Sequence, residues 1–232
     1  MQAKTRGARR RWPVGLVALL LLAHCGDDDD GSGTAGSGGG GGRGGDSGAA
    51  GAPVIEGERC EATLAQFPQL PSSHVAECSY LGPETFNSEP PSSGNHYGRW
   101  AAFKTYTQPV PRGYYVHSLE HGAIVFLYNC PGGCPAEVAV LQQIADALPA
   151  DPLCDGMGVR RRTVITPDPL LPPGTFAASA WGWTLKATCP DPDDFRAFAL
   201  DHYAQSYENF CNPGVDVIAA GLAPGCGQAP TP

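Results

Sequence analysis

The sequence predicts an α+β or α/β domain in which helices pack on a small mixed β-sheet, and disulfides stabilise a loop-rich N-terminal third. Three observations support this fold class. An apolar run rich in β-forming residues occupies 123–128, amphipathic helical patterns begin at 135 and 191, and eight cysteines follow residue 53. An even cysteine number is typical of a disulfide-stabilised exported domain.

The first third of the domain, up to about Arg112, is rich in Pro, Ser and Gly and predicts loops. Residues 114–117 favour a short strand, because two tyrosines and a valine prefer extended chain. The continuous apolar run at 123–128 (AIVFLY) predicts a strand that is buried on both faces.

A helix is expected over 135–148. Pro135 suits the first helical position and Pro149 ends the pattern. Its buried face follows the three-four spacing of an amphipathic helix at Val138, Leu141, Ile144, Ala145 and Leu148.

Two more strands and a second helix complete the expected order of strand, helix, strand, strand, helix. The strands are residues 163–166 and residues 176–187, the latter long enough to kink at Gly182. Asp191 is the expected helix cap, since a proline and two acidic residues follow it directly.

The N-terminus predicts export. Residues 1–12 carry five basic side chains and no acid, and residues 14–23 form a short apolar run. This run is too short to span a bilayer and is typical of a secretory signal. Leu22-Ala23-His24-Cys25 resembles a bacterial lipobox, although His24 departs from it, so Cys25 is the candidate lipidated residue in the cell envelope. The alternative is an ordinary cleaved signal in which Cys25 is incidental.

Residues 26–53 predict a disordered tether, because the segment is mostly Gly, Ser and Asp and has little to bury. Residues 54–232 are then a single globular domain. Without the signal, the chain has ten basic and 23 acidic side chains. Such a negative chain repels phosphate backbones, so nucleic acid is excluded as a partner and the bilayer is reached through Cys25 alone. The sequence indicates no protein partner.

The cysteine spacing does not determine the disulfide connectivity, since eight cysteines allow about 105 pairings. Pairing of Cys60 with Cys78 and of Cys211 with Cys226 is favoured, because each would close a local loop near one end of the domain. Closing a loop of about 18 residues is worth roughly 3 kcal/mol.

Three of the six histidines lie within residues 96–121, beside a carboxylate. The candidate metal ligands are His96, His117 and His121, with Glu120 as a fourth ligand or as a catalytic general base. Three imidazoles and a carboxylate suit zinc, and three imidazoles alone also suit copper. The alternative is that these residues hydrogen-bond loops in a structural or ligand-binding module. His74 and His202 are interpreted as bystanders.

The segment from His117 to His121 also has the H-x-x-E-H spacing of inverted zinc peptidases. That motif requires a long helix, whereas Gly122 follows directly and the preceding residues favour extended chain. The peptidase interpretation is therefore disfavoured.

Paired motifs carry a family resemblance. The segments PPSSGNHY at residues 90–97 and VHSLEHG at residues 116–122 resemble the PPTSGPHY and VHxLEHG pattern of domain of unknown function 3105. The similarity covers roughly residues 65–205, with Asn95 in place of the usual proline. It implies an exported or membrane-tethered protein, and it implies no particular activity.

A second candidate site is the pair Cys130 and Cys134. The segment CPGGCP at residues 130–135 resembles the C-P-x-x-C-P motif of Sco-type copper chaperones, which implies a thioredoxin-like fold and a thiol redox or copper role. Those chaperones also use a downstream histidine, and only His202 is available here. The six other cysteines favour a structural bridge instead.

Overall fold

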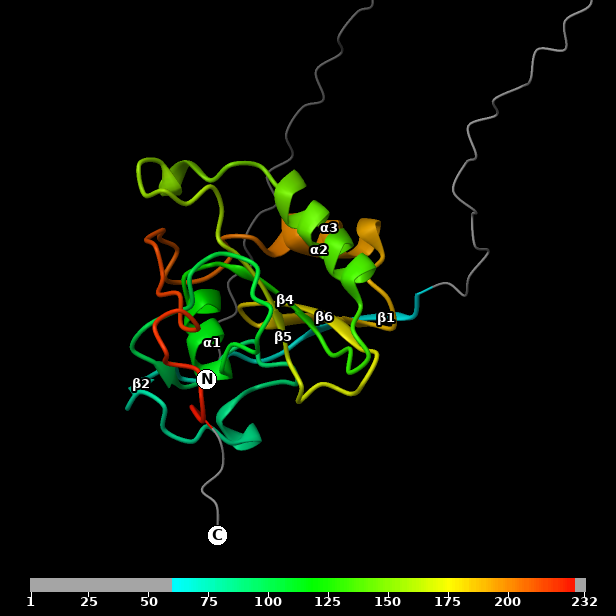
Figure 1. The fold of residues 1–232 in the computed structure, drawn as a ribbon. Helices are drawn as coiled ribbons and strands as arrows, with labels where there is room; N and C mark the ends of the chain where they lie inside the picture. Colours follow the sequence, from blue (N-terminus) through cyan, green and yellow to red (C-terminus); the bar gives the residue numbers. More distant parts are fainter. Residues whose placement is uncertain (1–59, 228–232) are drawn as a thin grey trace, which may run out of the picture. The chain divides into compact units, whose positions relative to one another are not determined.

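The computed structural model describes residues 60–227 (Figure 1), which belong to one compact unit between Ile55 and Pro232. The expected signal, the expected lipidation site Cys25 and the expected tether lie outside the described residues. Within 60–227, no helix is both long enough and apolar enough to cross a bilayer. The elements are β1 (Ala62–Gln66), β2 (His74–Val75), β3 (His96–Tyr97), α1 (Arg112–Glu120), β4 (Ile124–Tyr128), α2 (Pro135–Ala147), β5 (Thr163–Pro167), β6 (Phe176–Ala180), β7 (Trp183–Ala187) and α3 (Pro192–His202), with 3₁₀ turns at Pro83–Thr85 and Pro152–Cys154.

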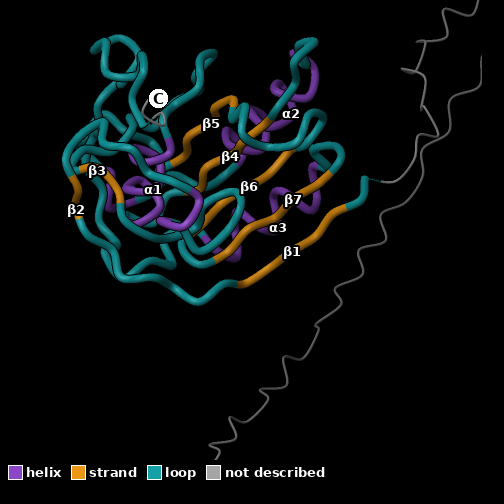
Figure 2. Tube along the Cα trace, turned by 90° about the horizontal axis from the view of Figure 1, so that it is seen from below, coloured by secondary structure: helices purple, strands orange, loops and turns teal. Residues whose placement is uncertain are grey.

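A mixed five-stranded sheet forms the centre of the fold, in the order β1-β7-β6-β4-β5. β4 and β5 are parallel, and the other neighbours are antiparallel. α2 and α3 pack together on one face of this sheet. Figure 2 shows α1 beside β2 and β3, away from α2 and α3. The expected α+β class is confirmed.

Strand β4 is buried on both faces, as its unbroken apolar run predicts. Ile124 and Phe126 point into the core beneath α2 and α3. Val125 and Leu127 point into the opposite core, beside α1. The sheet therefore separates two apolar layers, and α1 lies in the layer that carries the histidines.

The expected strand at 114–117 is wrong, because these residues lie within helix α1. All residues of α1 after Arg112 are buried, so no polar face marks the helical period. Packing of the aromatic residues overrides their preference for extended chain. The helix ends at Glu120, and Gly122 follows the cap residue His121 with a φ of +81°, which suits glycine.

The expected single strand at 176–187 is a hairpin of two strands, β6 and β7. Ala180 pairs with Trp183, so Trp181 and Gly182 form a two-residue turn. Gly182 has a φ of +78°, which allows the chain to reverse there instead of kinking. Strand β1 was not expected, since it lies at the sheet edge with four of its five residues exposed, so no buried apolar pattern marks it.

The two expected helices after β4 are confirmed as α2 and α3. Pro135 occupies the first position of α2, and Leu141 and Ile144 are buried on its inner face. In α3, the Asp191 carboxylate accepts hydrogen bonds from the backbone N–H groups of Asp193 and Asp194, as a helix cap does.

All eight domain cysteines form disulfides, but both favoured pairings are wrong. The bonds are Cys60–Cys189, Cys78–Cys226, Cys130–Cys134 and Cys154–Cys211. The sheet register explains the first bond. Ala62 pairs with Ala187, so two residues further out Cys60 meets Cys189. The disulfide connectivity is therefore set by pairing between segments that are distant in the chain, and not by the closure of short local loops.

From β4 onward the chain runs strand, helix, strand, strand, strand, helix. The first two strands are parallel neighbours, and both helices cover one face. Cys130 and Cys134 lie at the first strand-to-helix junction of this segment, between β4 and α2.

Candidate metal centre

The short parallel pair of strands β2 and β3 places two histidines side by side. His74 is the register partner of His96, so both imidazoles project from the same face of the ribbon. Their ring centroids are 5.2 Å apart. His96 is fully buried, whereas His74 is exposed at the rim.

Helix α1 supplies two further side chains. His117 and Glu120 are three residues apart and therefore lie on one helical face. The helix approaches β3 closely at Gly113, where an added Cβ would lie 2.5 Å from the Tyr97 ring. A larger residue at Gly113 would push the helix and its two ligands away from His96.

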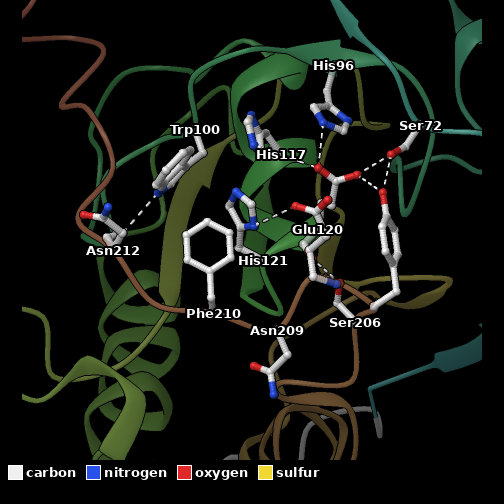
Figure 3. Close-up of polar contacts among 12 residues, drawn as sticks. Ser72, His96, Trp100, His117, Glu120, His121, Ser206, Asn209, Phe210 and Asn212 are labelled. Atoms are coloured by element: carbon white, nitrogen blue, oxygen red, sulfur yellow. Dashed lines mark hydrogen bonds and ion pairs between the residues drawn. The ribbon is translucent and has the colours of Figure 1, made fainter.

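Together these four side chains form the His/Glu group, which consists of His74, His96, His117 and Glu120. One ligand atom from each residue lies within 4.8 Å of the others, and three of the four residues are buried. His96 Nε2 is 3.0 Å and His117 Nε2 is 3.9 Å from the same carboxylate oxygen of Glu120. Figure 3 shows the Glu120 carboxylate between His96 and Ser72.

Backbone carbonyls orient two of the imidazoles. His96 Nδ1 lies 2.9 Å from the Gly94 carbonyl, and His117 Nδ1 lies 2.6 Å from the Tyr97 carbonyl. A carbonyl only accepts hydrogen bonds, so each Nδ1 carries a proton and donates. In the neutral rings each Nε2 lone pair therefore faces Glu120. Metal-binding histidines are held in the same way, with the second ring nitrogen donating to a carbonyl or carboxylate.

Glu120 is held in its charged form. Burial raises the pKa of Glu120, but its contacts with His96, Ser72 and Tyr207 outweigh burial and lower it to about 2. The Ser72 and Tyr207 hydroxyls both donate to the second carboxylate oxygen. Ser206 donates to the backbone carbonyl of Glu120. The C-terminal segment thereby fixes the carboxylate from the side opposite the histidines.

His117 is neutral at physiological pH. Burial lowers its pKa to about 3, and the neighbouring rings of His96 and His121 contribute to the decrease. Since metal ions bind neutral imidazole, the ring is available as a ligand without first losing a proton.

His121, expected among the ligands, lies outside the His/Glu group. Its ring packs against Trp100 and Phe210, with centroid distances of 4.6 and 3.9 Å. Figure 3 shows His121 beside these two aromatic side chains. Its Nδ1 is 3.7 Å from Glu208, whose carboxylate is 46% exposed. Burial lowers the pKa of His121 to about 4. The His121 ring therefore covers one side of the His/Glu group through packing contacts.

The donor set suits a borderline metal ion. Three imidazole nitrogens and one carboxylate oxygen match the ligands of zinc. Bonds of about 2.0–2.1 Å place tetrahedral ligand atoms about 3.3 Å apart. The 3.0 Å and 3.9 Å separations to Glu120 bracket that value. The four ligand atoms lie within 4.8 Å of one another.

The arrangement differs from that of the inverted zinc peptidases. Most of the H-x-x-E-H segment does lie on a helix, contrary to expectation, but only His117 and Glu120 belong to the group, while His121 is the C-cap of α1 and is not a member. Because Glu120 stands among the ligands, its position suits coordination better than the general-base role.

Sequence reasoning missed three participants, namely His74, Ser72 and Tyr207. His74 was interpreted as a bystander, and only the β2–β3 register brings it to His96. Tyr207 reaches Glu120 from 87 residues away. No local spacing signals either contact, because both depend on long-range pairing. His202 does remain apart, with its ring stacked on Trp183.

The comparisons with known proteins agree with the motif resemblance. The family model described as "Protein of unknown function (DUF3105)" matches residues 80–214, a span that includes His96, His117 and Glu120. No curated protein and no solved structure matches the chain. Since the matched span exceeds half of the sequence, the chain belongs to the DUF3105 family.

Proposed function

We propose that this protein is an exported, lipid-anchored domain that binds one divalent transition-metal ion, zinc foremost, at the His/Glu group. The observation that carries the proposal is the orientation of the buried imidazoles. His96 Nε2 faces the Glu120 carboxylate at 3.0 Å while its Nδ1 is committed to a carbonyl. In the neutral ring both facing atoms are acceptors, so a cation is required between them.

The surroundings favour a metal ion as that cation. His117 adds a second neutral Nε2 to the same carboxylate oxygen, and its low pKa disfavours a protonated ring. His74 adds a third imidazole at the solvent edge, where an ion enters or leaves. Four protein ligands make a closed centre of the structural type, with the exposed His74 as the one ligand at its solvent edge.

Export and lipid anchoring rest on the sequence. The basic and apolar N-terminal segments, the lipobox-like Cys25 and the glycine-rich residues 26–53 support a domain tethered to a membrane. Four disulfides in the described part of the chain support an oxidising compartment. Mass spectrometry of the mature N-terminus tests the anchor, and a free N-terminus beyond Cys25 would contradict it.

The second candidate function is a structural one, in which a proton takes the place of the metal. A doubly protonated His96 would form an ion pair with Glu120, and the Ser72 and Tyr207 hydroxyls would complete a network that pins the loops. The hydrogen bonds to Glu120 favour this alternative specifically, because they leave one carboxylate oxygen satisfied without any ion.

Calorimetric zinc titration of the tag-free mature domain distinguishes the two candidates. After chelator treatment, we expect one equivalent of zinc to bind wild type. His117→Asn should weaken binding by more than the roughly 10- to 100-fold loss that accompanies changes to outer-shell partners. His202→Asn is the matched control and should bind like wild type, since its ring stacks on Trp183. Equal affinity of wild type and His117→Asn would leave the structural candidate standing.

A further inference from the structure

The disulfide between Cys130 and Cys134 differs from the other three. Its cysteines are four residues apart, whereas the others join residues 57 to 148 positions apart. Stabilisation by a disulfide increases with the length of the loop that it closes. The neighbouring elements are also held independently, since β4 pairs with both β5 and β6 and α2 buries Leu141 and Ile144. The fold therefore depends little on this bond.

The bond lies where a thiolate is stabilised. Cys134 is the cap residue of α2, a helix of 13 residues, and no side chain accepts from the first-turn N–H groups. These groups and the helix dipole stabilise a negative charge on the Cys134 sulfur. A thiol with a lowered pKa is the better leaving group in disulfide exchange. Cys130, which follows β4, is the sulfur that an incoming thiolate attacks.

The bond is also accessible. Residues 131–133 are exposed, while both cysteines are half-buried against the core beneath α2 and α3. A Cβ added at Gly132 or Gly133 would meet no atom within 4 Å. The main chain of another polypeptide can therefore approach the sulfur atoms without displacing part of the fold. Cysteine pairs near βαβ units also form the redox motifs of thioredoxin-like proteins, with two intervening residues where this chain has three.

We propose that Cys130 and Cys134 form a dithiol–disulfide exchange site for flexible polypeptides that carry pairs of cysteine thiols. A partner thiolate attacks the Cys130 sulfur, the Cys130–Cys134 bond breaks, and Cys134 leaves as a thiolate. A second partner thiolate then attacks the mixed disulfide and releases Cys130. The partner loses two electrons and two protons and gains a disulfide, and Cys130 and Cys134 become thiols. This site uses none of the His/Glu group.

The test uses the oxidised mature domain and a reduced synthetic peptide with two cysteines, incubated without oxygen. Thiols are alkylated over time and located by mass spectrometry. We expect one oxidised peptide per protein, with free thiols only at Cys130 and Cys134 and opening at least about tenfold faster than at the other bonds. Absence of exchange, or equal opening of all four disulfides, would overturn the proposal.

Cysteine variants distinguish disulfide exchange at Cys130 and Cys134 from a purely structural disulfide. Cys134→Ser should accumulate a mixed disulfide on Cys130 when mixed with the oxidised peptide, because the resolving thiol is missing. The double variant Cys130→Ser/Cys134→Ser should lose exchange but keep its zinc affinity and melt within about 2 °C of wild type. Cys60→Ser/Cys189→Ser is the comparison and should melt at a clearly lower temperature, since that bond closes a long loop. Comparable destabilisation by both double variants would identify Cys130–Cys134 as structural and refute the proposal.

Discussion

Replacing Glu120 with Gln tests how much the buried carboxylate stabilises the metal-free domain. The pKa of Glu120 is about 2, against an ordinary value of 4.5. Each pKa unit corresponds to about 1.4 kcal/mol, so ionisation of this 3%-exposed group contributes about 3 kcal/mol to folding at pH 7. Glutamine keeps the size and one acceptor oxygen but removes the charge that faces His96.

The expected result is a decrease of about 3 kcal/mol in the free energy of unfolding, or roughly 6–12 °C in Tm for a domain of this size. Because the folded-state pKa lies below the unfolded one, the contribution is present above about pH 4.5 and is lost as the pH falls towards 2. The gap between wild type and variant should therefore shrink to about half by pH 3.

Urea unfolding in excess chelator, with disulfides intact, measures this gap. Glu208→Gln is the matched control, since its carboxylate is 46% exposed and its loss should cost less than about 0.5 kcal/mol. A Glu120→Gln variant within about 0.5 kcal/mol of wild type at pH 7 would refute the reasoning, as would a gap that does not change with pH.

Three further predictions concern the exposed ligand His74, Gly122 after the end of α1, and the buried ion pair of Arg162 with Asp151. His74→Asn should leave the unfolding free energy of the metal-free domain within about 0.5 kcal/mol of wild type, because the ring is exposed. The same variant should weaken zinc binding at least about tenfold in a calorimetric titration, and unchanged affinity would remove His74 from the site. Gly122→Ala should lower the free energy of unfolding in denaturant by about 3 kcal/mol, since its Cβ would lie 2.9 Å from the Ala204 Cα atom. Gly133→Ala, with the same φ of +81° and open surroundings, should lower it by only about 1 kcal/mol, and equal losses would contradict the close approach at Gly122. Arg162→Met should lower the unfolding free energy by about 3–5 kcal/mol, because it leaves the buried Asp151 carboxylate without its guanidinium partner. Arg99→Met, at an exposed ion pair, should lower it by less than about 1 kcal/mol, and similar losses in the two variants would contradict the difference between a buried and an exposed pair.

Local sequence patterns were sufficient for three elements in the second half of the fold. The apolar run of β4, the amphipathic spacing of α2 and the Asp191 cap of α3 each specify an element through nearest neighbours, and all three are confirmed. The same clustering drew attention to His96, His117 and Glu120, because imidazoles and carboxylates rarely gather without a polar role.

Only the tertiary structure decided how the site is assembled. Helix α1 is buried on every side, so its sequence has no periodic pattern, and its identity depends on packing against β3 through Gly113. His74 joins His96 through a two-residue strand pair that no propensity predicts. Tyr207 reaches Glu120 across 87 residues, and Cys60 meets Cys189 through the β1–β7 register. These contacts join segments that are distant in the chain, and their pairing is set by burial and register, which local sequence does not encode.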